Sequence, residues 1–222
     1  MAEAELLEYV KGLGDIYSVS APFDAQHYAL RDVGIKTPIS VRDASFARLH
    51  GNDQGYTRTC HGVIWAKDLP TIVARVSPLV DDPKMAGQAV QAHRRKEYLV
   101  VDTDKSIYAQ WETIAKQDKT KKPEDRRAIV IAKREYSFEI HKNSNVARFF
   151  WGNQREAYFR ELVTRNNVPC WQIPIKEVGA PDGTIINFVE FADSSDRSGL
   201  SFGRNNLHDN YRTLGVLEKR VA

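Results

Sequence analysis

The chain has 222 residues and a mass of 25.2 kDa, which suits one domain and excludes a peptide hormone or a multidomain array. Hydrophobic residues make up 42% and charged residues 27%, the mix of an ordinary folded protein rather than a collagen. The 32 Lys and Arg against 29 Asp and Glu leave a net charge of +3, which permits a polyanion partner without indicating one.

The two cysteines, Cys60 and Cys170, show no spacing typical of a disulfide framework or a zinc site, and we expect reduced, buried thiols. The acidic N-terminus is unlike a secretory signal, and no apolar run approaches the roughly 20 residues of a membrane helix. We therefore expect a soluble intracellular protein, cytoplasmic or nucleoid-associated, with no membrane partner. Its oligomeric state is left open.

The first third of the chain predicts a helix followed by strands. Apolar residues at helical spacing, Leu6, Leu7, Val10 and Leu13, predict an opening helix that Gly12 and Gly14 end. Short β-branched and aromatic runs then predict strands at residues 39–41, 63–65 and 72–76.

The middle of the chain predicts a helix, a strand and a second helix. Residues 85–96 are rich in Ala and Gln and end in basic residues, as a helix does. Residues 98–101 predict a buried strand, and the spacing of Ile107, Trp111 and Ile114 predicts a helix to about residue 116. Residues 116–127 are almost wholly polar and predict an exposed charged loop.

The last part of the chain predicts mainly strands. Residues 128–132 and 136–140 predict strands, and residues 153–165 predict a helix. A turn at 181–183 predicts a hairpin of residues 168–178 and 184–191, and residues 193–213 form a polar, loop-rich region. We expect an α+β single domain, residues 1–222, with a mixed, mainly antiparallel sheet packed against three or four helices.

The sequence around Asp102 carries the clearest candidate chemistry. An apolar strand runs into Asp102 and Asp104, whose side chains would share one face if the strand continued, close enough to hold Mg²⁺. Metal-assisted phosphoryl transfer needs such a carboxylate pair. Lys105 or His141 would stabilise charge or shuttle a proton, so the predicted catalytic residues are Asp102, Asp104, Lys105 and His141.

This string resembles the first motif of archaeo-eukaryotic primase-polymerases and the Asp-x-Asp strand end of haloacid-dehalogenase-type phosphatases. For the primase family, His141 and then Glu190 or Asp193 follow in the expected order, but the small-residue loop before the histidine is missing. For the phosphatase family, the motif lies in mid-chain rather than near the start, and no later Asp-Asp pair follows a strand.

Two alternatives remain for Asp102. Paired with Glu135 or Glu139 it resembles a restriction-type nuclease core, although Lys133-Arg-Glu135 inverts the usual carboxylate-x-lysine order. Asp102-Thr-Asp104 directly before a helix is also an N-terminal cap, whose carboxylates bind backbone N–H groups instead of a metal.

Two basic runs bracket the aspartates and would neutralise backbone phosphates, or else form solvated charged surface. Their predicted nucleic-acid-binding residues are Arg94, Arg95, Lys96, Lys119, Lys121, Lys122, Arg126 and Arg127. Of the four tryptophans, Trp151 beside Gly152 is the one expected to be least embedded in apolar sequence.

These patterns predict a nucleic-acid-binding enzyme, a Mg²⁺-dependent nuclease or nucleotidyl transferase that acts on DNA or RNA. The alternative is a non-enzymatic nucleic-acid-binding or protein-interaction module in which Asp102 to Asp104 only cap a helix.

Overall fold

The computed structural model describes residues 2–50, 55–132, 137–166, 169–173, 180–193, 198–202 and 212–217. The strands are β1 Glu5–Val10, β2 Gly14–Ser20, β3 Gly55–Ala66, β4 Thr71–Ala74, β5 Val100–Asp102, β6 Ala128–Ile131, β7 Phe138–Glu139, β8 Cys170–Ile173, β9 Thr184–Asp193, β10 Ser198–Ser201 and β11 Arg212–Leu217. The helices are α1 Phe23–Asp32, α2 Val41–His50, α3 Pro78–Asp81, α4 Pro83–Arg94, α5 Ser106–Gln117, α6 Asn145–Trp151 and α7 Arg155–Asn166, with 3₁₀ turns at Asp118–Thr120, Pro123–Asp125 and Gly152–Gln154.

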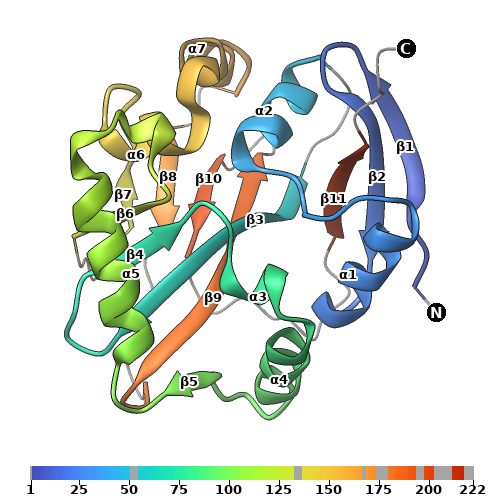
Figure 1. Ribbon diagram of the computed structural model, residues 1–222. Helices are drawn as coiled ribbons and strands as arrows, with labels where there is room; N and C mark the ends of the chain where they lie inside the picture. The colour runs from blue at the N-terminus through green and yellow to red at the C-terminus, as the bar shows by residue number, and fades with distance from the viewer. Residues whose placement is uncertain are drawn as a thin grey trace.

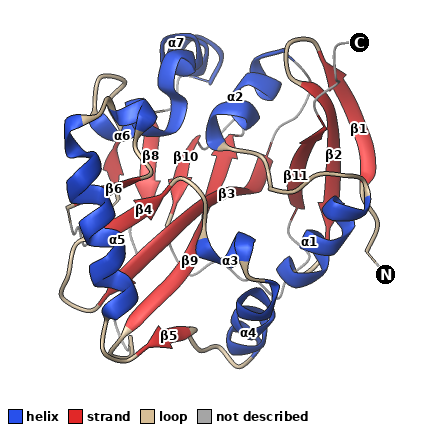
Figure 2. Cartoon of the chain, in the orientation of Figure 1, coloured by secondary structure: helices blue, strands red, loops and turns tan. Residues whose placement is uncertain are grey.

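A long antiparallel ladder between β3 and β9 forms the centre of the sheet (Figure 1). The sheet runs β1-β2-β11-β3-β9-β10-β8-β7, with β4 and β6 branching from β3 and β5 pairing with β9. Within the described residues only β10–β8 and β11–β3 are parallel pairs. Helices cover the sheet, as Figure 2 shows, and the predicted α+β fold with a mixed, mainly antiparallel sheet is confirmed.

Apolar side chains alternate between the two faces of the β3–β9 ladder. Val63 and Val189 face one core, which is completed by α2, α6 and α7. Ile64 and Phe188 face a second core, which is completed by α1, α3, α4 and α5. The apolar runs Val63-Ile-Trp-Ala66 of β3 and Ile185-Ile186 of β9 follow from burial on both faces.

A bulge in β3 between Arg58 and Gly62 divides that strand into two parts. The part before it pairs with β11, and the part after it pairs with β4. The bulged backbone finds other partners, since the Cys60 N–H donates to the Ile39 carbonyl and its carbonyl accepts from Ser77 N–H. A Cβ on Gly62 would lie 2.7 Å from Ser77 Cα, so this close approach requires glycine.

A buried polar network attaches β11 to the rest of the protein. Gln26 of α1 accepts hydrogen bonds through its side-chain oxygen from Arg58 Nη1 at 3.2 Å and from Thr213 Oγ1 at 2.6 Å. All three side chains are fully buried. A buried guanidinium is tolerated only when such partners surround it.

The predicted opening helix is wrong, because residues 5–20 form the β1–β2 hairpin. Gly12 and Gly14 adopt φ values of +88° and +130°, which allow the chain to reverse between the strands. Leu6 and Leu7 are 60% and 45% exposed, so the apolar stripe does not mark a buried helix face.

The predicted hairpin of residues 168–178 and 184–191 is also wrong in its pairing. β10 lies between the two strands, antiparallel to β9 and parallel to β8. Residues 168 and 174–178 of the prediction lie outside the described residues. The turn before Thr184 instead brings β9 beside β5, where Asp102 pairs with Thr184.

The other predicted elements agree in part. The helices at 85–96 and 107–116 are confirmed as α4 and α5, and the strands at 63–65, 72–76 and 128–132 as β3, β4 and β6. The predicted strand at 39–41 is wrong, because α2 begins at Val41. The helix expected over 153–165 is α7, which α6 precedes.

Trp151 is fully buried, and its indole N–H donates to Ser45 Oγ at 2.7 Å. We predict that Trp151→Phe lowers the free energy of unfolding by about 2–4 kcal/mol, because it removes this bond and leaves a cavity. The matched change Trp171→Phe, at a tryptophan that is 41% exposed, should change it by less than about 0.5 kcal/mol. Urea denaturation measures both, and equal losses would contradict the prediction.

Candidate functional site

The Asp102 carboxylate binds the first turn of α5, whose N-cap residue is Lys105, and is not one half of an open carboxylate pair. Its Oδ2 accepts hydrogen bonds from the Ile107 N–H at 2.6 Å and Ser106 Oγ at 3.2 Å. Its Oδ1 accepts from the Thr184 N–H at 3.2 Å. Partial burial would raise the pKa of Asp102, but these hydrogen bonds outweigh it and lower the pKa below its usual value.

Asp104 does not join Asp102 on a continuing strand. β5 ends at Asp102, and Lys105 has a left-handed φ of +61°. Asp104 Oδ1 accepts a separate bond from the Ser106 N–H at 3.1 Å. The structure therefore places both carboxylates on the backbone of the first turn of α5.

His141 lies far from the aspartates. Asp102 pairs with Thr184 at the start of β9, whereas β7, just before His141, joins the sheet through β8 and β10 at the other end of β9. The span from Thr184 to Ala192 is roughly 26 Å at about 3.3 Å per residue. The structure does not bring these candidate catalytic residues together.

No group of three or more His, Cys, Asp or Glu side chains able to hold a metal occurs among the described residues. Glu135 and Lys133 of the nuclease-like alternative lie outside them. Mg²⁺ binding stays a prediction that this structure does not test.

The basic loop after α5 folds around Asp118, whose side chain is only 1% exposed. Its carboxylate accepts hydrogen bonds from the Arg127 side chain and backbone N–H, and pairs with Lys121 at 2.9 Å. Arg127 first and then Lys121 hold the pKa of Asp118 well below its usual range. Arg126 donates to the carbonyls of Lys119 and Lys121.

Several residues of the two basic runs therefore have intramolecular partners, including Arg95, which pairs with Glu97 at 2.8 Å. Lys119 and Lys122 are exposed, as are Arg94 and Lys96. Their role with DNA or RNA stays a prediction.

A row of residues crosses the sheet at the end of β9 far from Asp102, with Tyr56, Trp171 and Glu139 exposed and the small residues Ala192 and Gly199 between them buried. The strand registers place one residue of each strand in line on one face. From β3 to β7 the row is Tyr56, Ala192, Gly199, Trp171 and Glu139. Two small residues thus separate two aromatic residues that are each 41% exposed.

The expectation for the tryptophans is reversed in the structure. Trp151, expected to be the least embedded, is fully buried and stacks on Tyr158 with ring centroids 5.3 Å apart. Trp171 is exposed instead. Its neighbours in β8 are Cys170 on one side and Gln172 and Ile173 on the other, so no clear alternation marks Trp171 as exposed.

Glu190 lies two residues before Ala192 on β9 and therefore on the same face. It is opposite Arg58 on β3 and Ser201 on β10. Its Oε1 is buried and accepts no hydrogen bond. Burial raises the pKa of Glu190 to about 7, although the positive charge of Arg58 acts in the opposite direction.

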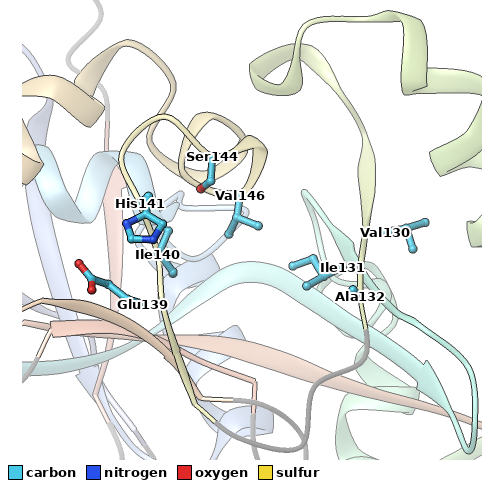
Figure 3. A pocket seen from close by; sticks show the side chains of 8 residues that line it. All are labelled: Val130, Ile131, Ala132, Glu139, Ile140, His141, Ser144 and Val146. Carbon is cyan, nitrogen blue, oxygen red and sulfur yellow. The ribbon is translucent and has the colours of Figure 1, made fainter.

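A cleft of about 440 Å³ adjoins the Glu139 end of the row. Figure 3 shows Glu139 and His141 on one side of it and Val130, Ile131 and Ala132 on the other. Val130 is 46% exposed on β6, a strand that pairs only with β4 in the described part of the chain. The cleft is lined mainly by apolar side chains, so it suits an apolar group.

Comparison with known proteins identifies the architecture. A solved structure described as "Accommodation of massive sequence variation in Nanoarchaeota by the C-type lectin fold" matches 94% of this chain and 100% of its own, with a TM-score of 0.57 and 11% identity. This chain has a C-type lectin-like fold. No protein family model matches the sequence, and no curated protein is significantly similar to it.

The prediction of a nuclease or nucleotidyl transferase is wrong. The fold match is to a C-type lectin fold and not to a nuclease, which overturns the nuclease and hydrolase assignments. The physical reason is the role of Asp102, whose oxygens bind the α5 N-terminus and the start of β9. In the described residues, no helix is long and apolar enough to span a membrane.

If Asp102 acts as a cap, Asp102→Ala should lower the free energy of unfolding by about 1–2 kcal/mol. Asp104→Ala should cost less, because Asp104 accepts one exposed backbone bond. Thermal unfolding with and without Mg²⁺ checks both variants. A Mg²⁺-dependent rise in Tm that Asp102→Ala abolishes would show a metal site instead.

Glu190 makes stability depend on pH in a defined direction. A folded pKa of about 7, above the unfolded value of 4.5, means that the folded state holds the proton more tightly. Stability is then greatest below about pH 4.5 and falls as pH rises towards 7. We predict that Glu190→Gln equals the wild type at pH 4 and exceeds it at pH 8 by at most about 3 kcal/mol. A difference that is independent of pH would contradict this.

Proposed function

We propose that this protein is a binding protein that recognises a protein ligand through the exposed side chains of Tyr56, Trp171 and Glu139 in this row and through the adjoining cleft. The observation that carries the proposal is the pair of exposed aromatic side chains presented by strands of a C-type lectin-like sheet. Tyr and Trp are the residues that most often dominate the energy of protein interfaces.

The row is built on the rigid part of the sheet rather than on an isolated loop. Each member lies on a strand that pairs on at least one side with the next strand of the row. The opposite face of the same strands holds Phe191 and Leu200, which are fully buried in the first core. A pre-positioned aromatic pair loses little conformational freedom on binding, which favours affinity.

The cleft supplies an apolar pocket at one end of this surface. Glu139 belongs both to the row and to the cleft lining, so the two are continuous. Figure 3 shows Glu139 at the cleft. A ligand backbone lying along the row would place an apolar side chain between β6 and β7. Pockets that receive such an anchor are typical of interface centres.

The neighbouring structure is described as one in which a C-type lectin fold accommodates massive sequence variation. We propose that this chain uses its fold in the same way, with stabilising contacts kept away from the recognition surface.

A selection experiment tests this proposal. Phage carrying random 12-residue peptides would be panned against the purified wild-type protein, and the enriched peptides measured by calorimetry. Trp171→Ala should weaken their binding by at least about tenfold, the effect of losing an interface hot spot. Leu7→Ala, which removes an exposed apolar side chain on β1, is the control and should leave affinity unchanged. Peptides that bind Trp171→Ala as well as wild type would refute the proposal.

A further inference from the structure

A groove of about 820 Å³ lies between α4 and β5. Both elements are found at the lower edge of the molecule in Figure 1. The pairing of β5 with Thr184 and Ile185 places the groove at the end of β9 opposite the row of Tyr56 and Trp171. Its α4 wall has exposed side chains and its β5 wall, residues 98–101, is half-buried, so the groove is open to solvent.

The groove follows the backbone edge of β5 rather than one face of the strand. Leu99, Val100 and Val101 are consecutive residues and all line it, although successive side chains of an extended chain point to opposite faces. The other edge of β5 is occupied by β9, and within the described residues no further strand pairs with it. The N–H and C=O groups along such an edge are a template for another extended chain.

The opposite wall is one face of α4, where Met85, Gln88, Gln91 and Arg95 recur at intervals of three or four residues. From Met85 to Arg95 the helix rises roughly 15 Å, at about 1.5 Å per residue. That length matches four or five residues of an extended chain at about 3.3 Å each. The exposed Gln88 and Gln91 amides carry donors and acceptors that suit the main chain of such a ligand.

Gly87 leaves the α4 wall without a side chain at this point of the groove. Glycine weakens a helix interior, so its presence there needs a reason. A Cβ on Gly87 would meet no heavy atom of the described residues within 4 Å beyond its own helix and chain neighbours, and its φ is not positive. Since neither packing nor backbone conformation requires glycine, the space it leaves is available to a ligand.

Two charged side chains of opposite sign also line the groove. Arg95 donates from Nε to Glu97 Oε2 at 2.8 Å, but both side chains are more than half exposed, and such a pair contributes little. The planar guanidinium presents further N–H donors that fit a carboxylate. Asp24, in the first turn of α1, supplies an anionic group. The groove is therefore complementary to a chain that carries both an acidic and a basic residue.

We infer that this groove is a second binding site, which takes an extended segment of a partner protein as an added strand beside β5. The segment pairs its main chain with the edge of β5 and with Gln88 and Gln91, and it places a carboxylate on Arg95 and an ammonium group on Asp24. Addition of a strand to an open sheet edge is a general mode of peptide recognition. The site lies at the other end of β9 and does not rest on the proposed function.

The test is an NMR titration with two pools of acetylated and amidated pentapeptides, Lys-X-Thr-X-Glu and its reverse, in which X is Val, Ile, Leu, Phe or Tyr. One pool should give saturable shifts of the Gln88 and Gln91 side-chain amides and of the backbone amides at 99–101. N-methylation of two successive peptide groups blocks both edges of the ligand strand and should weaken binding at least about tenfold. Failure of both pools to bind, or equal affinity after N-methylation, would overturn the inference.

Gly87→Phe fills the groove and should weaken binding of the peptide pool at least about tenfold, because it places a ring where the ligand lies. Lys84→Phe, on the same helix but outside the groove lining, is the matched control and should bind as wild type does. Unchanged binding by Gly87→Phe would contradict the site. The N-methylated peptides are tested on the wild-type protein, so that result does not depend on how the variants fold.

Arg95→Gln should weaken binding of the glutamate-containing pool at least about fivefold and leave the affinity of the same pool with Gln in place of Glu unchanged. Equal loss for both pools would refute the carboxylate contact. Trp171→Ala should bind the pool as wild type does, because Trp171 lies at the other end of the sheet. Loss of binding in that variant would overturn the assignment of a separate site.

Discussion

The bulge in β3 is the constraint on which the rest of the architecture depends. A strand that pairs with β11 before the bulge and with β4 after it must change direction without leaving buried backbone groups unpaired. The structure solves this with bonds from Cys60 to Ile39 and Ser77, and with the Thr59 hydroxyl, which donates to the Val189 carbonyl at 2.7 Å. Bulges of this kind redirect strands and the side chains that they carry.

The bulge also orders the first turn of α2. His61 is buried, and its Nε2 accepts the Val41 N–H at 3.3 Å, while its ring packs edge-on against Phe150. Burial lowers the pKa of His61 to about 3, so the imidazole remains a neutral acceptor throughout the physiological range. One displaced stretch of β3 thus connects the sheet to α2 and α6, the helices that complete the first core.

Sequence patterns predicted the middle of the protein well and its two ends poorly. The helices α4 and α5 have strong local signals in Ala content, apolar spacing and capping residues, and these signals are independent of the tertiary structure. The pairing of β8 with β10 joins segments far apart in the chain, which local turn chemistry at Gly183 does not encode. The prediction of an opening helix was wrong because Leu6, Leu7 and Val10 have helical spacing by coincidence, although residues 5–20 form a hairpin.

The candidate site was harder to predict than the fold. A strand that ends in two carboxylates, as at Asp102, is compatible with both a metal site and a helix cap. Only the hydrogen bonds that Asp102 Oδ1 and Oδ2 accept distinguish the cap from the metal site. Tyr56, Trp171 and Glu190 come from three distant segments that become neighbours through strand register alone. Nothing in their local sequences marks them as a group, since register is a property of the assembled sheet.

The position of β11 determines when the sheet can be completed. This strand is the last in chain order, yet it lies between β2 and β3, and its Thr213 completes the hydrogen bonding of Gln26. During synthesis the β1–β2 hairpin can form early, but β11 joins it to β3 within the sheet only when residues 212–217 arrive. Long-range closure of this kind slows folding, because the ordering of the intervening chain precedes the contacts that reward it. The two halves of the protein therefore become one cooperative unit only after residues 212–217 have been synthesised.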